Sequence, residues 1–211
     1  WLGYGLMPLG ANKVALLGSS GVVTDTSVLL ATGTTASAAS IEFTSLIDST
    51  YKQYVFGFYK VAPITNSTSL QMITSTDGGS TYGVTTTSTY FYAQHHVIWD
   101  TGATLAYDTS RDLAQSTSPQ ILAGSMANST QSAGGNNTPG AVLSGELILY
   151  NPASTTYVKH FTSKFSWNLY LAGAYITYPA GYVNTTSAIN AIKFYITSGN
   201  IEGTIKMWGV L

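Results

Sequence analysis

The sequence predicts an all-β protein, a jelly-roll-like antiparallel β-sandwich with an extended N-terminal arm, and three observations support this fold class. β-Branched and aromatic residues are abundant along the whole chain. No long segment spaces its apolar residues at intervals of three and four, as an amphipathic helix does. Short runs that alternate apolar and polar residues are separated by clusters of Gly, Asn, Asp, Ser and Pro, which favour turns between strands.

The length of 211 residues suits one domain with a sizeable core. We expect residues 1–39 to form an extended arm or linker and residues 40–211 to form the β-sandwich domain. The start of the chain is apolar, but it lacks a basic leading region and is interrupted by Gly3, Gly5 and Pro8, so it does not resemble a signal peptide. Because residue 1 is Trp rather than Met, we expect further segments upstream. No stretch reaches the roughly 20 apolar residues of a membrane-spanning helix, so we expect no membrane insertion.

Alternation locates the individual strands. We expect strands at residues 40–46, 51–63, 70–73, 90–99, 145–152, 155–165 and 167–181. Residues 190–211 are expected to form a closing hairpin that turns at Ser198, Gly199 and Asn200. The segment 51–63 is apolar on both faces, with Tyr54, Phe56 and Phe58 alternating against Val55, Tyr59 and Val61. Such a strand is buried on both sides or lies between a core and a partner subunit.

Charged residues are few, at 8% of the chain against about 25% in an average globular domain. Ser, Thr, Asn, Gly and Tyr replace them, and the net charge is −1, so little electrostatic repulsion keeps copies apart. Such a surface suits permanent assembly, and it suits sugars, because aromatic faces stack on rings while small polar groups bond to hydroxyls. Only 8 Lys and Arg residues are present, and they are scattered, so we expect no nucleic-acid partner. The absence of cysteine excludes disulfides and thiolate metal sites.

Catalytic constellations are weak, and we predict that the chain is not an enzyme, with no catalytic residue, no metal site and no cofactor. Nucleophilic hydrolysis needs a nucleophile beside a base, and no G-x-S-x-G motif occurs. His95 and His96 are adjacent on a predicted strand, so their side chains point to opposite faces. The 9 carboxylates are dispersed, and a glycosidase pair formed by two of them in space is an alternative that the sequence leaves open.

The acidic turn at Asp77, Gly78 and Gly79 has the signature of a tight hairpin, because glycine tolerates the positive φ of such turns. A calcium site is the alternative interpretation. Calcium loops supply several oxygen side chains at alternate positions, whereas this segment has one carboxylate. We therefore expect Asp77 to shape the turn.

A polar, Gly- and Asn-rich segment at residues 125–142 is the predicted binding loop, since long surface loops often carry function. The candidate ligand-binding residues are Asn128, Ser129, Gln131, Asn136 and Asn137. A surface loop without function is the alternative.

Aromatic residues fall into two sets. The alternation places Phe43, Phe56, Phe58, Phe194 and Trp208 in the sandwich interior. Tyr90, Tyr92, Tyr107, Tyr170, Tyr175 and Tyr178 are less clearly internal and are candidates for a subunit interface or a glycan groove.

Residues 40–82, 146–165 and 184–211 together resemble a group of bacteriophage virion proteins of the tail fibre, minor tail or host-recognition type. The similarity lies in the order of motifs: an Ile-Asp-x-x-Tyr segment before a strand, a connection broken by Pro, a strand that ends in S-x-DGG, and a Ser-Gly-Asn turn before the last strand. The resemblance implies a jelly-roll-like sandwich in a phage particle, with no catalytic motif.

From this resemblance and the low charge we expect a phage virion structural protein, a tail fibre or adhesin component involved in host attachment. We expect it to form a homo-oligomer, with a trimer favoured, and to contact other virion proteins and a host surface glycan. One alternative is a capsid decoration (cement) protein that stabilises the head, in which the arm at 1–39 clamps a neighbouring subunit. The other alternative is a carbohydrate-binding module or a glycan hydrolase.

Overall fold

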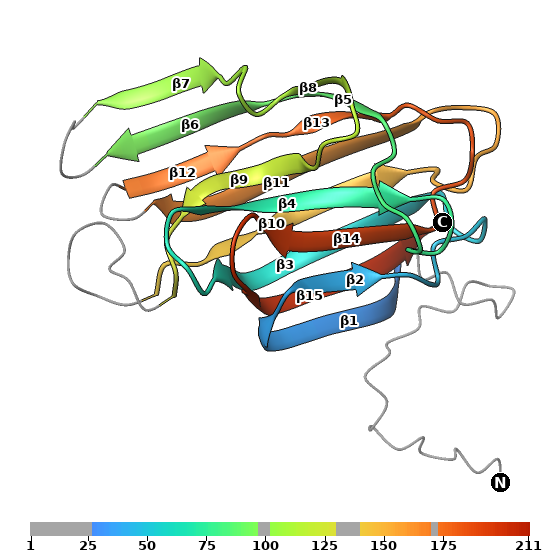
Figure 1. The fold of residues 1–211 in the computed structure, drawn as a ribbon, viewed down its shortest axis with the longest axis horizontal. Coiled ribbons are helices and arrows are strands. Elements are labelled where there is room, and N and C mark those ends of the chain that lie inside the picture. The colour runs from blue at the N-terminus through green and yellow to red at the C-terminus, as the bar shows by residue number, and fades with distance from the viewer. Residues whose placement is uncertain (1–26, 97–101, 130–139, 170–172) are drawn as a thin grey trace, which may run out of the picture.

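Fifteen antiparallel strands make up the fold of the protein in a computed structural model, which describes residues 27–96, 102–129, 140–169 and 173–211 (Figure 1). These residues contain no helix, and hence no helix that could cross a membrane. The strands form two antiparallel sheets in a sandwich-like arrangement, so the predicted all-β sandwich is confirmed. Its jelly-roll-like strand order stays a prediction.

The first sheet contains, in spatial order, β1 (Ser27–Ala38), β15 (Ile201–Val210), β3 (Gln53–Pro63), β10 (Leu143–Tyr150) and β11 (Lys159–Leu169). The second sheet contains β9 (Gln120–Met126), β4 (Thr68–Ser75), β14 (Ala191–Ile196) and β2 (Ser40–Phe43). The hydrogen-bonded path passes from one sheet to the other where β11 meets β9, at Leu169 and Met126.

Six shorter strands extend the first sheet beyond β11. Next to one half of β11 lie β12 (Gly173–Thr177), β6 (Phe91–His96) and β7 (Ala103–Tyr107), and next to the other half lie β13 (Ala180–Val183), β5 (Thr86–Thr89) and β8 (Leu113–Ser116).

The core lies between the two sheets, where each strand turns alternate side chains inward. Phe194 of β14 is fully buried and packs edge-to-face against Phe56 and Phe58 of β3, with ring centroids 5.4 and 5.0 Å apart. Phe58 also meets Phe165 of β11 at 4.9 Å. These rings join strands of both sheets, so they hold the two layers together.

The last two strands correct the predicted closing hairpin. The turn at Ser198–Asn200 exists, and Gly199 has a φ of 84°. However, β14 pairs with β4 and β2, whereas β15 pairs with β1 and β3. The chain therefore crosses from one sheet to the other, so that Phe194 and Ile205 are buried in the same core from opposite sides.

A β-bulge in β3 changes the predicted faces of this strand. Tyr59 and Lys60 are both exposed, whereas Val61, predicted on the same face as Tyr59, is fully buried. One extra residue in β3 causes the shift, since the register changes at this point against both neighbouring strands.

The structure describes only part of the predicted arm at residues 1–39. Residues 27–38 of this segment form β1, which pairs with β15 and therefore belongs to the sandwich. The remaining part, residues 1–26, lies outside the described residues.

Candidate functional site

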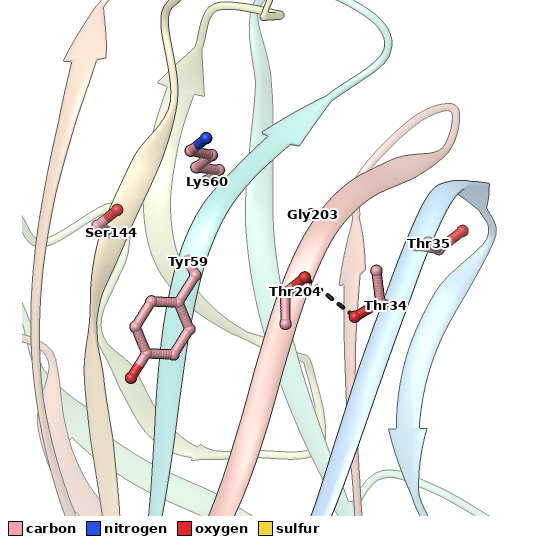
Figure 2. A pocket seen from close by; sticks show the side chains of 7 residues that line it. All are labelled: Thr34, Thr35, Tyr59, Lys60, Ser144, Gly203 and Thr204. Atoms are coloured by element: carbon pink, nitrogen blue, oxygen red, sulfur yellow. Dashed lines mark hydrogen bonds between the residues drawn. The ribbon is translucent and has the colours of Figure 1, made fainter.

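A shallow groove opens on the outer face of the first sheet, where β1, β15, β3 and β10 run side by side (Figure 2). Its volume is about 440 Å³, and it is lined by Thr34, Thr35, Tyr59, Lys60, Ser144, Gly203 and Thr204. Four of the seven lining residues are Ser or Thr, and the lining also contains one aromatic ring and one ammonium group.

The bulge in β3 creates this groove. Strand residues normally alternate between faces, so two consecutive side chains on one face require an irregularity. Lys60 has a φ of 52°, a left-handed conformation that is uncommon outside glycine, and this conformation lets both Tyr59 and Lys60 face outward. Across the strand pair Gly203 has a φ of 121°, and a Cβ at this position would lie 2.6 Å from the carbonyl oxygen of Lys60.

Tyr59 and Trp208 form an aromatic platform beside the groove. Tyr59 is 47% exposed, and its ring packs edge-to-face against the Trp208 ring with centroids 6.3 Å apart. Gly57 leaves the space for both rings, because a Cβ there would lie 2.8 Å from Cζ3 of Trp208 and 3.1 Å from the Tyr59 hydroxyl. Trp208, predicted in the core, is thus on the outer face, and Met207 takes the buried position.

The polar groups of the groove are available for a ligand. The hydroxyls of Thr34 and Thr204 are 3.0 Å apart and bond to each other, which leaves each with further capacity (Figure 2). Lys60 forms no ion pair with any described residue. The ammonium of Lys206 lies 5.5 Å from the centroid of the Tyr59 ring, close enough to interact with its face.

The two histidines whose side chains the structure describes lie on different strands. His95 is exposed on β6 and His160 is exposed on β11, while the side chain of His96 lies outside the described part of the chain. Among the described residues no group of three or more His, Asp or Glu side chains could hold a metal ion.

The structure describes the predicted binding loop only at its two ends, residues 125–129 and 140–142. The backbone N–H of Asn128 donates to Oδ1 of Asn66 at 2.8 Å, and its side-chain amide donates to the carbonyl oxygen of Ile64 at 3.2 Å. These bonds tie the base of the loop to the connection between β3 and β4. Ser129 follows, and Gln131, Asn136 and Asn137 lie outside the described residues, so the binding role of all five stays a prediction.

Of the six tyrosines proposed for an interface, the five that the structure describes do not line this groove. Tyr90 is fully buried, and burial raises the pKa of its hydroxyl to about 12. Tyr92 stacks on Tyr175 with centroids 5.9 Å apart, and Tyr178 stacks on Phe91 at 4.8 Å. Tyr107 is exposed on β7, and Tyr170 lies outside the described residues.

The acidic turn at Asp77 organises its own backbone. One carboxylate oxygen accepts bonds from the Ser75 hydroxyl at 2.6 Å and from the Thr81 backbone N–H at 2.9 Å, and the other accepts a bond from the Thr81 hydroxyl. These donors lower the pKa of Asp77 to about 2, with the Ser75 hydroxyl contributing most. Gly78 and Gly79 have φ values of 73° and 88°, as the turn prediction requires. The hairpin prediction is wrong, because the strand before the turn, β4, pairs with β9 and β14 rather than with β5.

The lowered pKa of Asp77 predicts a specific pH dependence. The ionised carboxylate stabilises the fold above pH 3.8, the ordinary pKa, and this stabilisation is lost as the pH falls through about 2. We expect Asp77→Asn to lower the urea midpoint at neutral pH, because the amide replaces one acceptor oxygen by a donor. The midpoints of wild type and variant are expected to converge at acid pH. Glu146→Gln, which removes the same charge from the sheet surface, is the control, and equal gaps between wild type and Asp77→Asn at both pH values would contradict the role.

Fold and site together define an all-β sandwich with an open, aromatic and hydroxyl-lined groove on one outer face. The chain matches no known protein family, no curated protein and no solved structure.

Proposed function

We propose that the chain is a non-enzymatic structural protein of a bacteriophage particle, a tail fibre or adhesin component whose groove attaches to glycans of the host surface. The observation that carries the proposal is the groove, in which the exposed ring of Tyr59 stands beside Lys60 and four hydroxyl side chains. A sugar offers an apolar ring face and several hydroxyls, and this lining complements both.

The phage assignment rests on the sequence resemblance of residues 40–82, 146–165 and 184–211. The motifs that carry it lie at turns: S-x-DGG closes β4, and Ser-Gly-Asn connects the two sheets before β15. Assembly into a homo-oligomer with other virion proteins as neighbours belongs to the same proposal, and the low charge of the chain suits it.

Tyr59→Ala is expected to weaken glycan binding, because it removes the exposed stacking face and leaves the sandwich core untouched. Stacking on an aromatic side chain is worth about 1–3 kcal/mol for nucleobases, so by analogy we expect a loss of affinity of roughly 5- to 150-fold. The measurement is a screen of host-surface polysaccharides with the full chain, followed by titration calorimetry with the best ligand. Tyr157→Ala is the matched control, since Tyr157 is exposed in the loop between β10 and β11, outside the groove.

Gly57→Ala provides a second variant that keeps every groove hydroxyl but displaces the rings of Trp208 and Tyr59. We expect this variant to weaken glycan binding, as Tyr59→Ala does. Binding that is unchanged in Tyr59→Ala, or a wild-type chain that binds no host glycan, would contradict the proposed function.

The location of the chain on the phage particle distinguishes a tail fibre component from a capsid decoration protein. A tail fibre component is present in few copies per particle, whereas a decoration protein covers the head. We expect labelling of intact particles to place the chain on the tail.

A further inference from the structure

Strand β1 is a long edge strand. It has 12 residues and pairs with β15 from Ser27 to Ala38, and no described strand pairs with its other edge. In Figure 1 it forms the lower margin of the sandwich. Along this edge the backbone N–H and C=O groups pair with no described strand, so another strand can pair with them.

The strand lacks two of the features that usually protect an edge, charge and proline, and it is regular in its centre. Its sequence, SVLLATGTTASA, contains no charged residue and no proline. Its register with β15 is regular from Ala31 to Thr35 and shifts only near its two ends. The other described edges are shorter: β7 has five residues, β8 has four, and β2 has four with the exposed Glu42 among them.

We propose that β1 pairs antiparallel with β1 of a second copy of this chain, around a two-fold axis close to Gly33. Identical uncharged strands meet without repulsion, and a two-fold contact uses the same surface on both copies. Thr32 and Thr34 face the same side, so their hydroxyls can pair across the interface. The chain already contains one such cross-strand pair, the 3.0 Å bond between the hydroxyls of Thr34 and Thr204.

This pairing has a consequence for the groove. The two-fold axis of an antiparallel strand pair in one sheet is perpendicular to the sheet, so both copies present their outer face on the same side. Thr34 and Thr35 of β1 line the groove. Two grooves then lie near the axis on one continuous surface, where a polymer with repeated units can occupy both and bind more tightly than to one.

The assembly goes beyond the proposed function and does not depend on it, since the strand edge pairs with or without a glycan. It also replaces the three-fold assembly that the sequence favoured. Edge pairing of one strand with its own copy produces pairs, whereas a ring of three needs two different surfaces.

The test is the mass of the full chain in solution, measured by sedimentation equilibrium. Thr32→Glu places a carboxylate opposite Lys206 within one copy, a favourable cross-strand pair. In the dimer it places two carboxylates at diagonal positions across the axis, about 7–8 Å apart, where like charges repel. Thr156→Glu adds the same charge to the exposed loop after β10. We expect a dimer for the wild type and for Thr156→Glu, and a monomer for Thr32→Glu.

A cysteine scan locates the axis, because the chain has no cysteine of its own. Single variants Thr32→Cys, Thr34→Cys and Ala36→Cys are oxidised, and efficient disulfide formation is expected for the position nearest the axis and not for Thr156→Cys. Hydrogen exchange of the β1 amides is followed at two protein concentrations, and protection is expected to rise with concentration.

Three results would overturn the pairing. The first is a monomer whose β1 amides are protected at every concentration, as when residues 1–26 cover the edge of their own chain. The second is a trimer whose β1 amides exchange freely. The third is a dimer that Thr32→Glu leaves intact.

Discussion

Phe194→Ala is expected to lower the free energy of unfolding by about 3–5 kcal/mol, the range for large aromatic truncations in a well-packed core. Phe194 is fully buried in β14 and contacts rings on Phe43, Phe56 and Phe58. Because Phe56 and Phe58 belong to the other sheet, the cavity would open at the contact between the two layers. Neighbouring rings held by their own strands can fill it only in part.

The measurement is urea denaturation followed by fluorescence, with the slope of the transition checked for constancy between variants. Phe91→Ala is the matched control, because Phe91 is 40% exposed at the start of β6 and stacks only on Tyr178 among the aromatic rings described. We expect a much smaller loss for this variant. Equal losses for the two variants would show that Phe194 does not join the sheets as its contacts indicate.

Alternation located most of the longer strands, but it missed β1, β5, β7, β8 and β9, and it did not predict how the strands pair. Ile192 and Phe194 alternate with Lys193 and Tyr195, and the first pair is buried while the second is partly exposed. Alternation identifies the inward face, but it carries no information on the neighbouring strand. The Ser-Gly-Asn turn allows a hairpin or a crossing between sheets, and the distant strands β1, β3 and β4 decide which of the two forms.

The groove was missed because a bulge interrupts the alternation that the prediction relied on. With strict alternation, Tyr59 and Val61 share a face and Lys60 takes the other. The sequence did hold a signal, since Tyr59 and Lys60 are two consecutive residues with polar ends between Phe58 and Val61. A phase break of this kind in an otherwise regular strand is typical of a bulge.

Local side-chain hydrogen bonds at residues 108–111 outweigh the helix propensity of the residues that follow. The segment Ser-Arg-Asp-Leu-Ala-Gln at residues 110–115 contains the helix-forming residues Arg111, Leu113 and Ala114, yet it forms a turn followed by β8. Asp108 accepts bonds from the backbone N–H and the hydroxyl of Ser110, at 2.9 and 2.6 Å, and pairs with Arg111 at 3.3 Å. Such bonds close a turn and compete with the first turn of a helix.

Gly145→Ala is expected to destabilise the sandwich by about 3 kcal/mol, at the upper end of the usual cost of overpacking a core. Gly145 lies in β10 between Phe58 of β3 and Phe165 of β11, and its missing side chain lets these two rings meet at 4.9 Å. A Cβ at this position would lie 2.8 Å from Cα of Phe165 and closer still to the carbonyl oxygen of Lys164. Backbone atoms in the middle of a sheet cannot move aside without breaking ladder bonds.

Gly124→Ala is the matched control for this substitution. A Cβ at Gly124 in β9 would also lie close to a neighbour, at 2.6 Å from Cζ of Arg111, but that neighbour is the far end of a flexible side chain. Arg111 can swing away at a modest cost, whereas the backbone beside Gly145 cannot. Urea denaturation is therefore expected to show a several-fold larger loss of stability for Gly145→Ala than for Gly124→Ala. Similar losses for both would mean that β10 and β11 can separate enough to admit a methyl group, and that the contact between Phe58 and Phe165 is not what fixes their spacing.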